Sequence, residues 1–284
     1  MFGIALLLVL CSGFTHALWN LFAKQSTDKA VFLWAIYMPS TIGLLPVFVV
    51  EGISNRLGIA EWLTIAASAA LQAIYALLLA QTYKAGDLSQ VYPIMRGLPT
   101  LLTPAAGVLI LGESLPPGSW IGIACMLVGF FVMVGWGRGL RQAVPNRRPA
   151  WLAIGVGLCI SAYTLIDKVN LGYLSPLALL GVANLGFILG LTPAALGRGR
   201  LMQVVKRHGN ILWLGAILSP GSYLLFLCAA SQADLSLVAP LREVGIVFGA
   251  ALGFLVLKEA QGARRIAASV AIVTGIVVLA AFVR

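Results

Sequence analysis

The chain has 284 residues, of which 60% are hydrophobic and only 10% are charged. A soluble domain is roughly half apolar and a quarter charged, and the mean hydropathy here is +0.98, so the composition excludes a water-soluble protein. A formal net charge of +10 would suggest nucleic acid as the partner of a soluble protein, but the positions of the basic residues, given below, argue against that partner.

Apolar runs follow one another along the whole chain, with short connections between them. A membrane helix needs roughly 20 apolar residues, and ten runs are close to that length. They lie at 2–23, 30–50, 59–82, 88–111, 118–137, 150–168, 176–196, 210–230, 235–257 and 263–283. The predicted fold class is therefore all-α integral membrane with ten transmembrane helices. The first run is not predicted to be a cleavable signal, because no basic segment precedes it and no small-x-small motif follows.

Polar and aromatic side chains share helix faces in the first and third runs. His16 and Asn20 are four residues apart with Trp19 beside them, so one face would carry an imidazole, an indole and an amide. Gln72 and Tyr75 are three residues apart in the third run. Hydrogen bonding between helices, or aromatic packing, would explain each residue alone. Together they favour the lining of a cavity for a small polar solute.

The fourth run begins with an irregular motif that recurs in the ninth. Asp-Leu-Ser-Gln-Val-Tyr-Pro occupies 87–93 and is followed by Arg96, and Asp-Leu-Ser-Leu-Val-Ala-Pro occupies 234–240 and is followed by Arg242. An arginine at such a depth is costly in hydrocarbon and faces protein or a wet cavity by default. The two arginines therefore mark the predicted centre of function.

The one longer connection is basic and divides the chain into two halves. We predict a first five-helix repeat at 1–137, a cytoplasmic linker at 138–149 and a second repeat at 150–284. In the second half, Tyr163 in the sixth run and Tyr223 in the eighth occupy positions that correspond to the polar positions of the first half. Both tyrosines are therefore predicted to line the same cavity.

Similarity between the halves extends beyond the arginine motif. Trp19–Lys24 resembles Tyr163–Lys168 at an offset of 144 residues, and Ile42–Pro46 resembles Leu189–Pro193 at an offset of 147. Because each half has five runs, an odd number, the second must enter the membrane from the opposite side, which makes the repeats inverted. Inverted repeats with interrupted helices are typical of secondary transporters, whose substrate site lies at the midplane between the halves.

Prolines recur at matching positions inside the runs. Pro46 corresponds to Pro193, and Pro93 corresponds to Pro240. Each removes a backbone hydrogen bond and bends its helix. A kink for packing would explain any single proline, but the repeated pairs favour hinges.

The charges at depth indicate the kind of site. Arg96 lies about eight residues into its run and Arg242 about seven residues into its own from the opposite face, which places them roughly 12 Å and 10 Å deep. Glu243 is the only acidic residue that we place well inside a run. One interpretation is a structural network in which Glu243 pairs with an arginine. The other is a positively charged pocket for a carboxylate, with Glu243 as the ionisable coupling residue.

The remaining basic residues report topology. Fourteen of the 19 lie in loops that alternation places on one side of the membrane, and only three lie on the other. The fourteen are Lys24, Lys29, Lys84, Arg138, Arg141, Arg147, Arg148, Arg198, Arg200, Lys206, Arg207, Lys258, Arg264 and Arg265. The positive-inside rule assigns that side to the cytoplasm, so both termini are predicted to be periplasmic.

The His16-Ala-Leu-Trp-Asn20 sequence, the five-run repeats and the recurring Asp-Leu-Ser-x-Val-x-Pro motif resemble the EamA-like members of the drug/metabolite transporter superfamily. The resemblance covers essentially the whole chain. It implies a secondary carrier of the bacterial inner membrane, with a cavity formed by the first, third, fourth, sixth, eighth and ninth runs. The related small multidrug carriers keep a glutamate in the middle of their first span, which is absent here, so their cation–proton antiport is not predicted.

The predicted function is secondary active transport, more specifically export, of a small polar metabolite that carries a carboxylate, such as an amino acid. The predicted substrate-binding residues are Arg96, Arg242, Trp19, Asn20, Tyr75, Tyr163, His16, Gln72 and Tyr223. We predict no catalytic residue, metal site or cofactor, and a proton or an ion as the coupling species. The predicted partners are the lipid bilayer and the solute, not nucleic acid, and the chain is expected to act as a monomer or homodimer.

Three alternatives remain. The first is a carrier of cations, drugs or quaternary amines with the same fold. The second is an intramembrane enzyme, although no Gly-x-Ser-x-Gly, His-Glu-x-x-His or P-loop motif occurs. The third is a channel, which differs from a carrier in showing no saturation and no counterflow.

Overall fold

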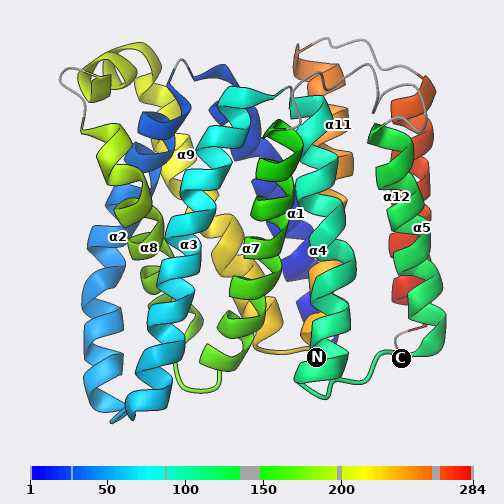
Figure 1. Ribbon diagram of the computed structural model, residues 1–284, viewed down its shortest axis with the longest axis horizontal. Coiled ribbons are helices and arrows are strands. Elements are labelled where there is room, and N and C mark those ends of the chain that lie inside the picture. The colour runs from blue at the N-terminus through cyan, green and yellow to red at the C-terminus, as the bar shows by residue number, and fades with distance from the viewer. Residues whose placement is uncertain are drawn as a thin grey trace.

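The structure is a computed structural model that describes residues 2–26, 28–86, 88–134, 148–196, 200–257 and 263–282. Within these ranges the chain is nearly all helical (Figure 1). The helices of the first half are α1 (Phe2–Gln25), α2 (Lys29–Ser54), α3 (Ile59–Ala85), α4 (Leu88–Ile110) and α5 (Pro117–Val134). Those of the second half are α7 (Arg148–Asn170), α8 (Pro176–Ala195), α9 (Arg200–Ala230), α10 (Leu235–Leu241), α11 (Val244–Leu257) and α12 (Ala263–Ala281).

Seven of the described helices are long and apolar enough to cross a membrane. Their apolar segments are Gly3–Ala23, Lys29–Ser54, Ile59–Ala85, Val91–Ile110, Arg148–Asn170, Pro176–Ala195 and Gly209–Ala230. Two further apolar helices, Pro117–Met133 and Ile266–Ala281, are shorter than these seven. The number of ten membrane spans stays a prediction.

The run at 235–257, predicted as one span, is two helices. α10 ends at Leu241 and α11 begins at Val244, and the amides between them bond three residues back: Glu243 to the Pro240 carbonyl at 3.0 Å and Gly245 to the Arg242 carbonyl at 3.1 Å. Pro240 lies just before the break, but the amide hydrogen that it lacks would have bonded to Ser236, before the interrupted part of the ladder. The break places Arg242 and Glu243 in a turn within the bundle.

Local side-chain chemistry sets several helix ends. The Asp28 carboxylate accepts a hydrogen bond from the Val31 amide at the start of α2, and the Ser175 hydroxyl accepts one from Ala178 at the start of α8. After α4, Gly112 has a φ of +69°, a left-handed conformation that glycine adopts without strain. This turn leads to Glu113, whose carboxylate accepts the Leu235 and Ser236 amides at the start of α10, both at 2.7 Å.

The helices of the two halves pack in matching combinations. α1 contacts α9 and α11, while α7, its counterpart in the second half, contacts α3 and α4. α2 packs on α9 as α8 packs on α3, and three corresponding pairs meet each other directly: α2 with α8, α4 with α10, and α5 with α12. Exchanging the two halves therefore preserves the largest of these contacts.

Glycines allow the closest of these approaches. A Cβ atom added to Gly122 of α5 would lie 2.6 Å from the Gly275 carbonyl oxygen of α12, and one added to Gly275 would lie 2.5 Å from the Gly122 oxygen. Small residues at such crossings let helix backbones meet where lipid removes the hydrophobic driving force.

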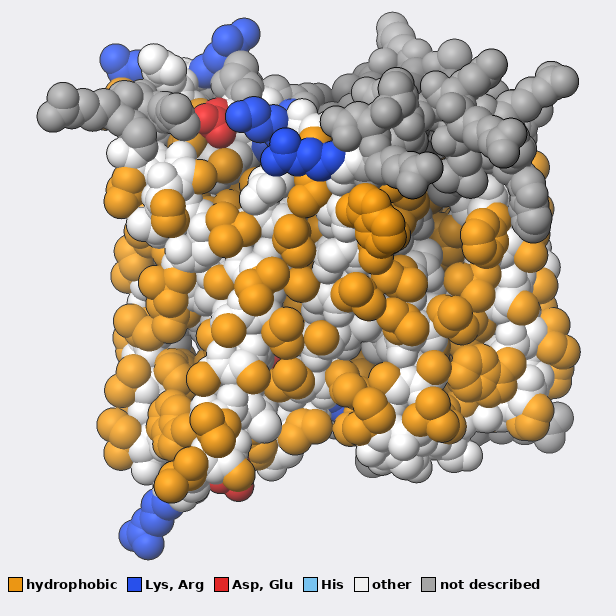
Figure 2. Space-filling model, in the orientation of Figure 1, with side chains coloured by type: hydrophobic (Ala, Val, Ile, Leu, Met, Phe, Trp, Pro, Cys, Tyr) orange, Lys and Arg blue, Asp and Glu red, His pale blue; other side chains and the backbone are white. Residues whose placement is uncertain are grey.

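The outer surface suits a bilayer. Hydrophobic side chains cover the flank of the molecule, and most of the visible Lys and Arg side chains gather at one end (Figure 2). The two chain termini lie together at the opposite end (Figure 1). Large side chains such as Ile53, Ile59 and Leu109 are more than 70% exposed, which water disfavours and hydrocarbon does not.

Candidate functional site

A small cavity lies where the two halves meet. It is lined by His16, Trp19, Tyr37, Gln72, Tyr75, Arg96, Tyr163, Ala183, Asn184, Phe187, Ser219, Ser222, Tyr223 and Arg242. These residues come from α1, α2, α3, α4, α7, α8, α9 and the turn between α10 and α11. The cavity has a volume of about 30 Å³, enough for one or two water molecules.

Eight of the nine substrate-binding residues predicted from the sequence line this cavity. They are His16, Trp19, Gln72, Tyr75, Arg96, Tyr163, Tyr223 and Arg242. The ninth, Asn20, is not among the lining residues. Its amide group donates to the His16 carbonyl at 2.9 Å, and its oxygen accepts the Tyr83 hydroxyl at 3.4 Å, so its polar groups bond within the protein.

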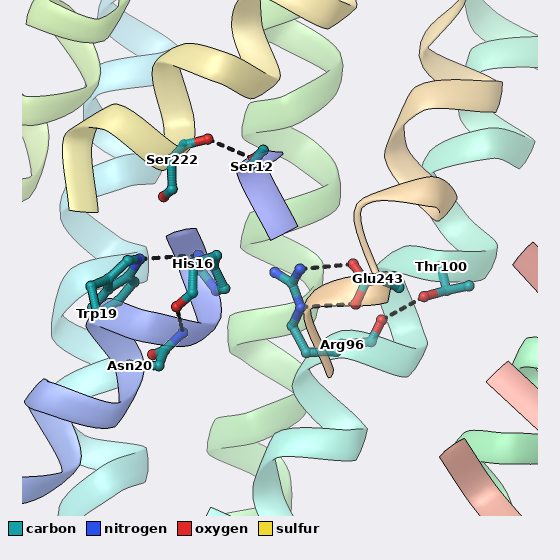
Figure 3. A network of polar contacts seen from close by, with 8 residues as sticks. All are labelled: Ser12, His16, Trp19, Asn20, Arg96, Thr100, Ser222 and Glu243. Carbon is teal, nitrogen blue, oxygen red and sulfur yellow. Dashed lines mark hydrogen bonds and ion pairs between the residues drawn. The ribbon is translucent and has the colours of Figure 1, made fainter. Parts of the chain in front are cut away.

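Arg96 and Glu243 form a two-point ion pair that joins the halves. Arg96 Nε lies 2.9 Å from Glu243 Oε2, and Nη2 lies 2.9 Å from Oε1 (Figure 3). The two side chains are only 7% and 5% exposed. Two parallel charge-assisted bonds are the strongest arrangement for this pair. Glu243 therefore neutralises the arginine of the other half and not its neighbour in sequence.

Arg242 carries a buried charge of a different kind. It is 7% exposed, and among the described residues no carboxylate pairs with it and its Nε has no hydrogen-bond partner. The guanidinium carbon lies 4.6 Å from the centre of the Phe226 ring and 5.4 Å from that of Tyr223. Ring faces stabilise a cation but do not neutralise it. The cavity wall thus presents one uncompensated positive charge.

His16 is positioned by Trp19. The indole Nε1 of Trp19 donates to His16 Nδ1 at 3.2 Å, and the rings meet edge to face (Figure 3). Nδ1 must be unprotonated to accept this bond, so the ring hydrogen lies on Nε2. In this arrangement the His16 ring is neutral, and it offers Nε2–H as a donor.

Aromatic rings form much of the remaining wall. Tyr75 meets Tyr163 with ring centres 5.5 Å apart and Phe187 at 5.8 Å, and Tyr37 stacks on Phe187 at 4.1 Å. Such rings give a rigid, mainly apolar enclosure with a few polar groups. The cavity therefore combines one cationic group with an aromatic cage.

α2 and α8 contribute residues that were not predicted. Tyr37 comes from α2, while Asn184 and Phe187 come from α8. Asn184 is 1% exposed, donates to Ser40 Oγ at 3.0 Å and has no partner for its own oxygen among the described residues. A lone amide in the middle of the run at 176–196 was the signal that could have identified it, because buried polar groups in membrane helices are rare.

A second acidic residue, Asp167, is also buried. It lies one turn before the end of α7 at Asn170 and is only 1% exposed. Its carboxylate accepts the Ser68 hydroxyl at Oδ1 and the Tyr223 hydroxyl at Oδ2, both at 2.5 Å. The hydroxyl of a cavity residue is thus bonded to a second buried acid.

The predicted hinge prolines fall into two groups. Pro93 and Pro240 are buried, and Pro240 lies two residues before the break between α10 and α11. Pro46 and Pro193 are exposed, and α2 and α8 continue through them.

Comparisons with known proteins agree with this architecture. The model of the EamA-like transporter family matches residues 3–135 and again 147–281. Protein RarD from Streptomyces exfoliatus is 29% identical over 171 residues, 58% of this chain and 50% of that protein, so the chain spans about half the length of this curated relative. A solved crystal structure aligns with 98% of this chain and 95% of its own at a TM-score of 0.76 and 15% identity, which shows the fold alone. With both halves matched by the family model, this integral membrane protein belongs to the EamA-like transporter family.

Proposed function

We propose that the protein is a secondary active transporter that exports a small metabolite carrying a carboxylate, such as an amino acid. The observation that carries this proposal is the buried guanidinium of Arg242, which lines the cavity without a carboxylate partner among the described residues. An anionic group is what such a charge binds most strongly, by charge-assisted hydrogen bonds. The Tyr75 and Tyr163 rings and Trp19 would enclose the rest of the solute.

We propose ten membrane spans in two inverted repeats, with α10 and α11 together forming the ninth. The matched packing of the two halves supports this arrangement, because inverted repeats would be expected to place corresponding helices in corresponding contacts. The basic end would face the cytoplasm of a bacterial cell and the termini would face the periplasm, which agrees with the charge asymmetry in Figure 2.

The size of the cavity supports alternating access as the mechanism. A volume of about 30 Å³ is too small for an amino acid, so the helices around it must separate before a metabolite enters. The turn at Arg242 and Glu243 is the natural place for this movement, because the helical ladder is already interrupted there. The Arg96–Glu243 ion pair would keep the halves in register while they rock.

The aromatic wall favours one alternative, a carrier of quaternary amines or other cations, since ring faces bind such groups. Arg242 argues against it. A second cation in the cavity would meet the uncompensated charge of this arginine at low dielectric, where repulsion is strong.

Counterflow in proteoliposomes tests the proposal. Proteoliposomes that contain the purified protein are loaded in turn with unlabelled amino acids, organic acids and quaternary amines. Uptake of the matching radiolabelled compound is then measured. We expect saturable exchange of a carboxylate compound, its loss in Arg242→Ala, and its retention in Arg264→Ala, which removes an exposed arginine of α12. Exchange confined to quaternary amines would establish the alternative, and flux without saturation or counterflow would indicate a channel.

A further inference from the structure

Asp167 is a buried acid that the proposed substrate site does not use. It lies one turn from the end of α7, at the contact of α3, α7 and α9, with Ser68 and Tyr223 donating to its two oxygens. An ionised carboxylate at 1% exposure requires either a cation or a proton to offset its desolvation. Among the described residues no basic side chain pairs with it.

The neighbouring lysine does not supply that cation. Lys168 follows Asp167 in sequence, but its ammonium donates to the Ala230 carbonyl at 2.6 Å and to the Ala233 carbonyl at 2.8 Å. It therefore stabilises the C-terminal end of α9, where carbonyl groups lack helical partners.

The partners of Asp167 tolerate both of its protonation states. A serine or tyrosine hydroxyl can donate to a carboxylate, and it can rotate to accept a hydrogen bond from a carboxylic acid. Glu243 lacks this freedom because the Arg96 guanidinium only donates. Protonation of Glu243 would also leave the buried charge of Arg96 unpaired, whereas protonation of Asp167 leaves no basic side chain of the described residues without its partner.

Tyr223 connects Asp167 to the cavity. Its hydroxyl donates to Asp167, while its ring lines the cavity 5.4 Å from the Arg242 guanidinium carbon. The other titratable groups near Asp167 are Tyr163 of α7 and Tyr173 in the turn after α7.

Charge balance couples the two sites. Arg96 and Glu243 neutralise each other, so among the described residues around the cavity and α7 the unpaired charges are the positive Arg242 and the negative Asp167. An anion bound at Arg242 would leave one excess negative charge in a space of low dielectric, and a proton on Asp167 removes it.

We propose that Asp167 takes up a proton when an anionic substrate binds at Arg242. The carboxylate takes up one proton and becomes a carboxylic acid when an anionic group occupies Arg242, and it returns that proton to water when the group leaves. This is an acid–base step without electron transfer. The inference rests on the proposed function for its anion, but the proton site can be tested without a substrate.

Infrared difference spectroscopy of the reconstituted protein between high and low pH detects the carbonyl stretch of a protonated carboxylic acid. We expect such a band in the wild type, its loss in Asp167→Asn and its retention in Asp234→Asn, which alters an exposed acid before α10. Tyr223→Phe keeps the ring and removes one hydrogen bond to Asp167, so it should move the band to a different frequency.

Removing the charge of Arg242 imitates its neutralisation by an anion. In Arg242→Met the acid band should therefore persist to higher pH than in the wild type. An unchanged band in both Asp167→Asn and Tyr223→Phe would overturn the proposal. The proposal would also be overturned if Arg242→Met left the pH dependence of the acid band unchanged. If counterflow fails for every compound while the band is present and shifts as expected, the proposed transport is refuted. The proton site is then still supported.

Discussion

The two copies of the Asp-Leu-Ser-x-Val-x-Pro motif build different structures. In the first half the motif lies at the start of one continuous helix, α4, although Pro93, Pro99 and Pro104 all fall inside it. In the second half the helix breaks two residues after Pro240, and Arg242 and Glu243 occupy the turn. Proline number therefore does not decide where the chain breaks.

The packing around one glycine of the neighbouring helix differs between the continuous α4 and the broken α10–α11 segment. Gly13 of α1 and Gly157 of α7 are equivalent, and each meets the partner helix just after its arginine. A Cβ atom on Gly13 would lie 2.8 Å from Cγ1 of Val244, 3.0 Å from the Gly245 amide nitrogen and 3.2 Å from the Arg242 carbonyl oxygen. On Gly157 the closest atom would be Cβ of Leu98 at 3.1 Å, and the closest backbone atom would be the Met95 carbonyl oxygen at 3.4 Å. A side chain is the nearest contact in both halves, but the backbone of the broken segment comes closer to α1 than the backbone of α4 comes to α7.

This difference explains the unequal arginines. The continuous helix holds Arg96 where Glu243 reaches it with both oxygens, and the broken one exposes Arg242 to the cavity without a carboxylate among the described residues. The two copies of the motif are thus followed by one arginine paired with a carboxylate and one without such a partner among the described residues. Four substitutions can break or sharpen that comparison.

Glu243→Gln should have the largest effect. It leaves Arg96 buried without a counter-charge, which costs about 3–5 kcal/mol of unfolding free energy. Denaturant unfolding in detergent micelles measures this loss. The double variant Arg96→Met with Glu243→Leu is the control, because replacing a whole buried pair by apolar groups is nearly neutral. A loss below about 1 kcal/mol in Glu243→Gln would mean that the ion pair does not hold the halves together.

Arg242→Met should separate transport from stability. No partner carboxylate is orphaned, so the unfolding free energy should change by less than about 1 kcal/mol. Transport efficiency for a carboxylate compound should fall by roughly 30- to 1,000-fold, equivalent to about 2–4 kcal/mol. Initial rates in proteoliposomes, with Arg264→Met as the matched surface control, test this. Equal loss of stability and transport would assign Arg242 to the structural network.

Gly245→Ala tests the reason given for the break. The added Cβ would lie 2.8 Å from the Gly13 carbonyl oxygen, and relieving that contact should cost about 1–3 kcal/mol. Gly249→Ala, one turn later, is the control, since its Cβ would meet only Ala17 Cβ at 4.0 Å. Thermal unfolding of both variants gives the comparison, and equal midpoints would remove the close approach as the cause of the break.

The sequence predicted the helical class and most of the cavity because those features depend on local signals. Apolar length marks a membrane helix, and Arg96, Arg242 and the aromatic residues stand out in apolar surroundings. It did not reveal which arginine forms the ion pair with Glu243, because that depends on the angle at which the two halves meet. Asp167 was not included in the predicted site for a related reason: position near a helix end suggests contact with water, and only tertiary contacts show that Ser68 and Tyr223 cover it.

Glu113→Gln should have the smallest effect of the four. The Glu113 carboxylate accepts two backbone amides at the start of α10, where helix ends favour negative charge, so it ties the first half to the broken segment of the second. An amide keeps one acceptor oxygen but not the charge, and the expected loss of unfolding free energy is about 0.5–2 kcal/mol. Asp234→Asn is the matched control, because Asp234 precedes α10 without bonding to it through its side chain, and it should change stability by less than about 0.5 kcal/mol. Equal values for the two variants in denaturant unfolding would show that Glu113 is not what holds α10 against α4, and the break would then depend on Gly245 and the ion pair alone.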